Sequence, residues 1–124
     1  MTKKIERGMV IDVNLEPTKG SETGKVRPCV VVTNNVYNAR VPIIQVTPIT
    51  AWSAKKGKIK TNVTLTASST NGLTKKSVAD CLQTRPIDHR LRLVKVRGKL
   101  TNEDMKKIDR ALRFCSSLKN KMIT

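Results

Sequence analysis

A glycine-bounded loop at residues 20–28 carries several side chains that could do chemistry. Its sequence, GSETGKVRP, places a hydroxyl at Ser21, a carboxylate at Glu22 and cations at Lys25 and Arg27. The apolar run of residues 29–33 follows directly and indicates a buried strand. Polar loops held by a rigid strand commonly carry binding and catalytic groups. We therefore expect this loop to be the functional centre of the chain.

The charge of the chain indicates which partner such a loop would meet. The 124 residues include 25 lysines and arginines against 9 aspartates and glutamates, a net charge of +16. The basic residues are spread along the sequence, and self-repulsion of this size opposes compaction. We therefore expect a polyanionic partner, with nucleic acid favoured over a membrane surface or a merely basic protein.

The loop contains residue types suited to cleaving RNA without a metal. That reaction uses the 2′-hydroxyl as an internal nucleophile. It needs a base, a cation for the phosphorane charge and an acid for the leaving oxygen. Arg27 could supply the cation, because a guanidinium fork matches two phosphate oxygens. Glu22 could act as the base, and a hydroxyl from Ser21 or Thr50 could orient the phosphate. On residue types alone, Glu22 could equally pair with Lys25 or Arg27.

Other chemistries lack the residues they need. The sequence has no Walker-type phosphate loop, no G-x-S-x-G and no H-E-x-x-H motif. His89 is the only histidine, and it lies in a polar turn where a solvated surface residue is expected. The acidic residues are dispersed, which disfavours a two-metal carboxylate site. We therefore expect neither a metal nor another cofactor.

Short strands are the main elements that must position the loop. Alternating or β-branched apolar residues predict strands over 8–15, 29–33, 41–50, 62–66, 77–83 and 93–100. Residues 51–60 are predicted to be a mobile loop, and 86–92 a single helical turn. A C-terminal helix capped by Thr101 is predicted from a helical stripe of Met105, Ile108, Ala111, Leu112, Cys115, Leu118 and Met122. This order predicts one mainly β domain over residues 1–124, a small, curved antiparallel barrel with a helix against it.

The three cysteines suggest a reducing compartment. Cys29, Cys81 and Cys115 are widely spaced among apolar residues, so buried free thiols are expected rather than disulfides. No apolar run is long enough for a membrane span, and none marks a signal peptide. We therefore expect a cytoplasmic protein that does not enter a membrane.

Short motifs follow one another along the chain in a definite order. They are Gly20-Ser21-Glu22, Arg27-Pro28, Pro48-Ile49-Thr50, Gly72-Leu73, Ser77-Val78, Gln83 with Arg85, Ile87-Asp88, Gly98-Lys99-Leu100 and the closing helix. No single motif is specific, but the ordered set covers essentially the whole chain and resembles the MazF/PemK family of toxin endoribonucleases.

This resemblance implies an SH3-like barrel that forms a homodimer and cleaves single-stranded mRNA at a short sequence without metal. It implies products with a 2′,3′-cyclic phosphate and a 5′-hydroxyl, and inhibition by a cognate antitoxin peptide laid over the active groove. The family's catalytic arginine falls on Arg27, its threonine on Thr50 and its loop carboxylate on Glu22. The loop serine falls on Ser21. The family's RNA contacts fall on Gln83 and Arg85.

The chain departs from one branch of that family. The branch has an Arg-x-Asp pair just before the Gln83 position and a histidine at the Ser21 position. Here the pair is replaced by Asp80 and Leu82, so the acid–base pair of that branch is absent and Asp80 is not expected to take its role. The chain is more similar to the branch that relies on the arginine and the threonine.

The basic segment after the third predicted strand is a further candidate for RNA contact. Trp52 is followed by Lys55 and Lys56, with more lysines at positions 58 and 60. A basic loop with an aromatic residue could clamp single-stranded RNA by charge and base stacking. The alternative is a solvated loop with Trp52 folded onto the barrel. Lys25 completes the set of residues expected to bind RNA.

Two other functions stay open on the sequence alone. One is a non-catalytic nucleic-acid-binding barrel of the SH3-like type. The other is a CcdB-like topoisomerase poison, which shares the fold. It is less favoured, because such poisons act through a C-terminal Trp-Gly-Ile and residues 121–124 are KMIT.

Overall fold

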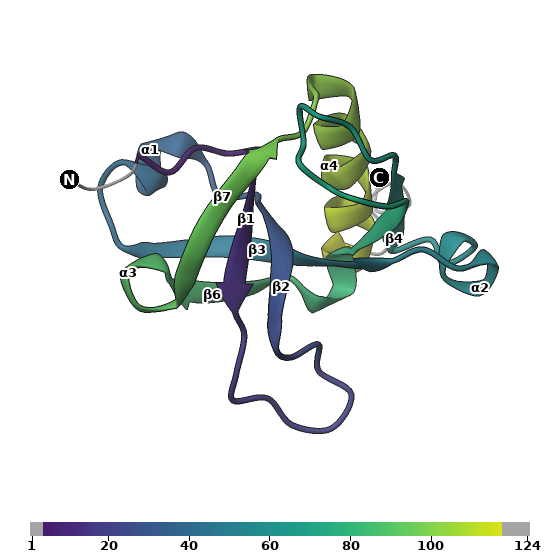
Figure 1. Cartoon of the computed structure of the whole chain (residues 1–124), viewed down its shortest axis with the longest axis horizontal. Helices are drawn as coiled ribbons and strands as arrows, with labels where there is room; N and C mark the ends of the chain where they lie inside the picture. The colour runs from purple at the N-terminus through teal and green to yellow at the C-terminus, as the bar shows by residue number, and fades with distance from the viewer. Residues whose placement is uncertain (1–3, 118–124) are drawn as a thin grey trace.

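The computed structural model describes residues 4–117, which form an antiparallel sheet with a helix packed against it (Figure 1). The strands are β1 (Met9–Asn14), β2 (Val26–Val31), β3 (Ile43–Ala51), β4 (Asn62–Leu65), β5 (Ser77–Asp80), β6 (Arg85–Asp88) and β7 (Leu93–Lys99). The helices are α1 (Asn35–Asn38), α2 (Ala54–Gly57), α3 (His89–Arg92) and α4 (Asn102–Ser117), and a 3₁₀ turn spans Cys81–Gln83. The mainly β class with a C-terminal helix is therefore confirmed.

Strand β3 organises the sheet because it pairs along both of its edges. One edge pairs with β2, and Cys29 lies opposite Pro48 there. The other edge pairs with β6 over residues 43–46 and with β5 over residues 49–51. The strand order is β4-β5-β3-β2-β1-β7, with β6 beside β3. Within residues 4–117 no pairing joins β4 to β7, so the sheet is open and the expected barrel describes it only loosely.

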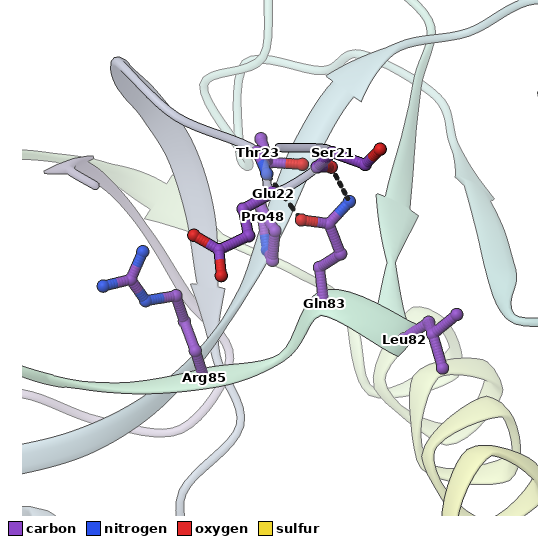
Figure 2. Close-up of a pocket in the computed structure, with 7 residues that line it drawn as sticks. All are labelled: Ser21, Glu22, Thr23, Pro48, Leu82, Gln83 and Arg85. Atoms are coloured by element: carbon purple, nitrogen blue, oxygen red, sulfur yellow. Dashed lines mark hydrogen bonds between the residues drawn. The ribbon is translucent and has the colours of Figure 1, made fainter. Parts of the chain in front are cut away.

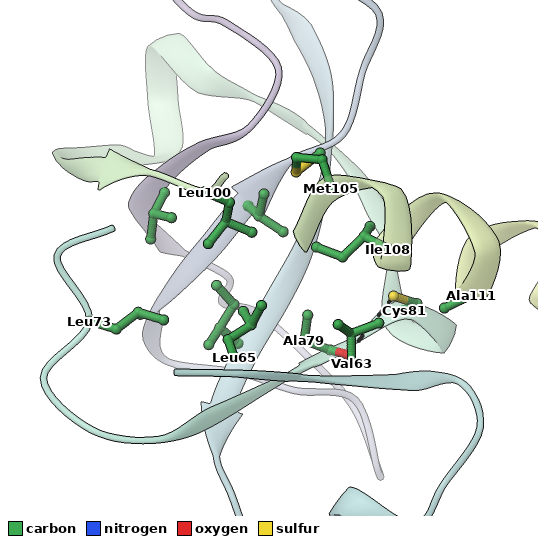
Figure 3. Packing of buried hydrophobic residues seen from close by; sticks show 12 residues of the cluster. Val63, Leu65, Leu73, Ala79, Cys81, Leu100, Met105, Ile108 and Ala111 are labelled. Carbon is green, nitrogen blue, oxygen red and sulfur yellow. Dashed lines mark hydrogen bonds between the residues drawn. The ribbon is translucent and has the colours of Figure 1, made fainter. Parts of the chain in front are cut away.

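Buried apolar side chains form two clusters. Successive residues of the central strands belong alternately to one cluster and to the other. One cluster joins Val10 and Val30 of the sheet to α4, whose Ile108 points into it (Figure 3). The other includes Ile11 and Val13 of β1. The alternating apolar and polar residues of β1 are typical of a half-buried strand, but here both faces of the strand are covered, and Asp12 is buried with its apolar neighbours. Loss of a buried Leu or Ile in such a core typically costs about 2–5 kcal/mol.

Helix α4 begins as predicted and packs with the predicted face. Thr101 Oγ1 accepts a hydrogen bond from the Asp104 amide at 3.1 Å, which satisfies one free donor of the first turn. Met105, Ile108 and Ala111 are buried against the sheet. Leu112 and Cys115 are partly buried beside them. The predicted stripe also included Leu118 and Met122, which lie outside the described residues.

Some segment boundaries differ from the predicted ones. Strand β2 begins at Val26, so Arg27 lies on a strand and not on the preceding loop. The strand predicted over 77–83 ends at Asp80 and continues as the 3₁₀ turn. The turn predicted over 86–92 divides into β6 and α3, because its first half pairs with β3 despite Pro86. The segment predicted as a loop over 51–60 contains α2, and Ser53 Oγ accepts from the Lys56 amide at its start.

The prediction of buried free thiols is confirmed for two of the three cysteines. Cys29 and Cys81 are buried and Cys115 is partly buried, and all three are free thiols. Burial is the main cause that raises the pKa of Cys29 and of Cys81 to about 12. Among the residues that the structure describes, no helix is long and apolar enough to cross a membrane.

Candidate active site

The loop between β1 and β2 projects from the sheet (Figure 1) and is shaped by one of its own carboxylates. Glu16 accepts hydrogen bonds from the Lys25 amide at 2.6 Å and from the Thr18 amide at 3.2 Å. The bond from the Lys25 amide is the largest cause that lowers the pKa of the Glu16 carboxyl. Gly24 is needed beside this carboxylate, because a Cβ there would lie 2.5 Å from Glu16 Oε2. The exposed Lys25 adopts φ 67° at this turn.

Residues of the distant 83–85 segment tie this loop to the sheet. Gln83 Oε1 accepts from the Thr23 amide at 2.5 Å, and Gln83 Nε2 donates to the Ser21 carbonyl at 3.4 Å (Figure 2). Arg85 Nη1 donates to the Leu15 carbonyl at 3.0 Å. The two side chains that the family resemblance assigns to RNA therefore also position the loop in the free chain.

A cleft of about 580 Å³, here called the loop cleft, lies between this loop and the 82–85 segment. It is lined by Ser21, Glu22, Thr23, Pro48, Leu82, Gln83 and Arg85. Figure 2 shows the Glu22 carboxylate turned toward the side of Arg85. Glu22 Oε1 also accepts a hydrogen bond from the Lys19 amide at 2.7 Å. Glu22 thus shapes the loop as well as lining the cleft.

Arg27 and Thr50 lie together in a second cleft of about 310 Å³, here called the Arg27 cleft. Its lining residues are Val26, Arg27, Pro28, Ile49, Thr50, Ala51, Leu73, Thr74, Lys75, Ser77 and Arg97, none of them acidic. The pairing of β2 with β3 brings the two residues together from distant parts of the sequence. Arg27 Nε donates to the Gly24 carbonyl at 3.0 Å, which fixes its side chain at the base of the loop. Lys56 Nζ lies 3.4 Å from Thr50 Oγ1.

Trp52 lies just beyond the end of β3, against α2. Lys76 Nζ lies 4.0 Å from the centre of its ring, a cation–π contact. Gly57 is packed on the indole, because a Cβ there would be 2.7 Å from Trp52 Nε1. The side chain is therefore partly folded onto its neighbours, yet the residue stays 37% exposed. Lys55 is exposed on the same short helix.

Most of the site residues predicted from sequence lie at one of the two clefts. Arg27 and Thr50 share one, with Lys56 bonded to Thr50. The other holds Ser21, Glu22, Gln83 and Arg85. Trp52, Lys55 and Lys25 line neither of these two clefts. In residues 4–117 no group of three or more His, Cys, Asp or Glu side chains is placed to hold a metal ion.

Sequence reasoning missed Arg92 and Arg97. Arg92 Nη1 donates to the carbonyls of Asn14 and Glu16, at 2.9 and 2.5 Å, and so braces the start of the loop. Arg97 lines the Arg27 cleft. The available signal for Arg97 was Gly98, because a glycine inside a strand often marks a bulge.

Known proteins match this chain over most of its length. Residues 6–115 match the family described as PemK-like, MazF-like toxin of type II toxin-antitoxin system. The chain is 37% identical over 114 residues to Endoribonuclease EndoA of Bacillus subtilis (strain 168), covering 92% of this chain and 96% of EndoA.

Solved structures share the fold. MazF (Form-I) from Deinococcus radiodurans gives a TM-score of 0.77 at 21% identity, covering 90% of this chain and 96% of that one. An endoribonuclease in complex with its cognate antitoxin, from Mycobacterial species, gives a TM-score of 0.71 at 21% identity, with coverages of 90% and 94%. Because the family match extends over residues 6–115 and EndoA is similar over nearly its whole length, the chain belongs to the PemK-like, MazF-like toxin family of type II toxin–antitoxin systems.

Proposed function

We propose that this chain is the toxin of a type II toxin–antitoxin system and cleaves single-stranded mRNA at a short sequence, without a metal ion. The observation that carries the proposal is the Arg27 cleft. Its arginine and threonine come from two strands and meet in a cleft whose lining has no acidic residue. A relative of 37% identity that is named an endoribonuclease supports the same activity.

In the proposed reaction, the 2′-oxygen of one nucleotide attacks the adjacent phosphorus while a base removes its proton. The bond from phosphorus to the 5′-oxygen breaks, and an acid protonates that oxygen. The products are a 2′,3′-cyclic phosphate and a 5′-hydroxyl. Arg27 stabilises the extra negative charge on the phosphorane oxygens, and Thr50 orients the phosphate through its hydroxyl. One such charge-stabilising donor is worth roughly 10²–10³-fold in rate.

Glu22 is the carboxylate proposed to take the 2′-proton. Its Oε1 accepts from the Lys19 amide, whereas Oε2 makes no hydrogen bond within residues 4–117. Glu22 lines the loop cleft and not the Arg27 cleft. The loop must therefore bring Glu22 toward the phosphate when RNA binds, or RNA must span both clefts.

The remaining predicted residues are proposed to bind RNA on either side of the reacting phosphate. Ser21, Gln83 and Arg85 offer polar groups in the loop cleft. Lys25 is exposed on the loop between them and β2. The exposed part of Trp52 is available to stack on a base, and Lys55 and Lys56 lie beside it to neutralise phosphates.

The toxin is proposed to act as a cytoplasmic homodimer that an antitoxin peptide inhibits. One solved structure of this fold is described as an endoribonuclease with its cognate antitoxin, which supports such a partner. An acidic or amphipathic peptide over these clefts would compete with RNA for the same cations. The free cysteines suit a reducing cytoplasm.

The test is cleavage of a long single-stranded RNA in EDTA, with the 5′ ends mapped. We expect discrete cuts that Arg27→Ala slows by roughly 10²-fold or more, with RNA binding retained. Arg113→Ala is the matched control, because it removes the same charge from an exposed position on α4 outside both clefts. Circular dichroism of each variant checks that it is folded.

The alternatives give different results in the same assay. Binding without cuts by the wild-type protein would refute the enzyme and support a non-catalytic RNA-binding domain. Cuts that appear only with added magnesium would refute the metal-free mechanism.

A further inference from the structure

Arg97 occupies a bulge in β7 at the point where that strand pairs with β1. Val10 lies opposite Gly98, but the next residue of β1, Ile11, lies opposite Val96. Arg97 therefore has no partner on β1 and is the extra residue of the bulge. Bulges re-aim a side chain and occur often beside active sites. Here the bulged arginine lines the Arg27 cleft.

The guanidinium of Arg97 is held by two fixed acceptors. Its Nε donates to Asp12 Oδ1 at 2.6 Å, and its Nη1 donates to the Gly72 carbonyl at 3.0 Å. Asp12 is only 7% exposed, so its carboxylate is shielded from solvent. The third nitrogen, Nη2, makes no hydrogen bond within residues 4–117.

The backbone around the bulge is packed too tightly to move freely. A Cβ at Gly98 would lie 2.2 Å from the Thr70 carbonyl oxygen. A Cβ at Gly72, which has φ +71°, would lie 2.5 Å from the Arg97 carbonyl oxygen. The two glycines thus let the 70–72 turn lie directly on the bulge, and this contact fixes the direction of the Arg97 side chain.

A purely structural role explains this arrangement poorly. A buried ion pair costs desolvation and is often no more stable than an apolar pair of similar size. Arg97 also keeps 23% of its side chain exposed, in a cleft that already contains Arg27 and Lys75. Asp12 offsets the charge of Arg97, but Arg27 and Lys75 still leave the cleft with a surplus of positive charge that a bound anion would balance.

We propose that Arg97 is an RNA-binding residue that donates from Nη2 to a phosphate next to the scissile one, with Asp12 as the positioning residue that holds the guanidinium in place. This inference rests on the proposed function, because it assumes that RNA enters the Arg27 cleft. In this proposal Arg27 contacts the reacting phosphate and Arg97 contacts the neighbouring one. Because the neighbouring phosphate does not change during the reaction, Arg97 stabilises the bound substrate and the transition state equally. Such a contact changes KM and leaves kcat nearly unchanged.

The test uses the double variant Asp12→Asn/Arg97→Gln, since Arg97→Gln alone would leave a buried carboxylate unpaired. Two amides can still hydrogen-bond across the sheet, while the cationic donor is lost. Asp88→Asn/Arg90→Gln is the matched control, because it neutralises an ion pair of 2.8 Å, between the exposed Arg90 and the partly buried Asp88, outside both clefts. We expect KM for RNA cleavage to rise roughly 10- to 100-fold in the first variant, the loss of one charge-assisted hydrogen bond. The control should keep the wild-type KM.

Arg97→Lys separates this contact from a general effect on folding. Lysine keeps the charge and the pairing with Asp12 but not the fork, so KM should lie between those of the wild type and the double variant. A folded double variant with the wild-type KM would overturn the proposal, as would a loss confined to kcat.

If the wild-type protein binds RNA without cutting it, the proposed function fails, and the same variants are compared by fluorescence anisotropy. A weaker affinity of the double variant alone would then still support the Arg97 contact, and an unchanged affinity would refute it.

Discussion

Gln83 is expected to control the order of the loop even when no RNA is bound. Its side chain bonds the loop at two points, with a short bond from the Thr23 amide, at 2.5 Å, and a long bond to the Ser21 carbonyl, at 3.4 Å; its Nε2 also donates to Asp80 Oδ2, outside the loop, at 3.3 Å. A typical intramolecular hydrogen bond contributes about 0.5–1.5 kcal/mol. Because the second bond is near the limit of the accepted distance, Gln83→Ala should cost the closed loop about 1–2 kcal/mol. That value corresponds to a rise of roughly 5- to 30-fold in the population of the open loop.

Amide hydrogen exchange measured by NMR without RNA is the direct assay. The Thr23 amide should exchange faster in Gln83→Ala by that factor, while amides of β1 and β2 keep their rates, because the loop can open without the sheet. Gln45→Ala is the matched control, since Gln45 is exposed on β3 and its side chain makes no hydrogen bond in the described structure. An unchanged rate at Thr23 would show that the loop is ordered by its own turn contacts, and would refute the role given to Gln83.

Other predictions test the loop, the core and the helix separately. Acid should loosen the loop, because the Glu16 carboxylate holds it only while it is ionised. Since the pKa of Glu16 is lowered in the folded protein, its stabilisation of the loop is complete above the ordinary pKa of 4.5. That stabilisation is lost as the pH falls through the lowered pKa. The protection of the Lys25 amide against hydrogen exchange, taken relative to its intrinsic exchange rate at each pH, should therefore fall in acid, and Glu16→Gln should remove that dependence. Because burial raises the pKa of Cys29 to about 12, iodoacetamide should modify it only after unfolding, while Cys115 reacts first in the native protein, as mass spectrometry can show. Thr101→Ala removes the cap of α4 and should lower the free energy of unfolding by about 1 kcal/mol, measured in urea with an unchanged m-value.

The elements that the sequence predicted well are those set by local pattern. Apolar residues recur every second position in β4 and about every 3.6 positions in α4. In both elements the face that carries them is buried, as at Leu65 and Ile108. Strand β6 was missed because Pro86 lacks an amide hydrogen, which argues against a strand. Its extended form depends on pairing with β3, where Pro86 lies opposite Gln45, and no local pattern reports that contact.

The site was predicted as a set of residues and not as an arrangement. Family motifs pointed to Arg27 and Thr50, and strand pairing places both in one cleft. The separation of Glu22 from them depends on the loop's conformation, which a bond from Gln83 across 60 residues helps to fix. Arg97 was missed because the one sequence signal of the bulge, Gly98, does not say which neighbouring side chain the bulge redirects.

The acidic residues explain why so large a positive charge is left over. Seven of the nine make a hydrogen bond or an ion pair within the described chain: Glu6 with Lys99, Asp12 with Arg97, Glu16 and Glu22 with loop amides, Asp80 with Gln83, Asp88 with Arg90, and Asp109 with Arg7. The other two, Glu103 and Asp104, lie in the first turn of α4, where the helix dipole favours negative charge. These interactions stabilise turns, a bulge and a helix end. Because the sequence has 25 basic residues and only 9 acidic ones, most of the basic residues cannot each have a carboxylate partner of their own. A bound polyanion would relieve their mutual repulsion. The surplus of cations around Arg27 therefore supports the proposed RNA substrate, and it equally supports an acidic antitoxin segment as the proposed inhibitor.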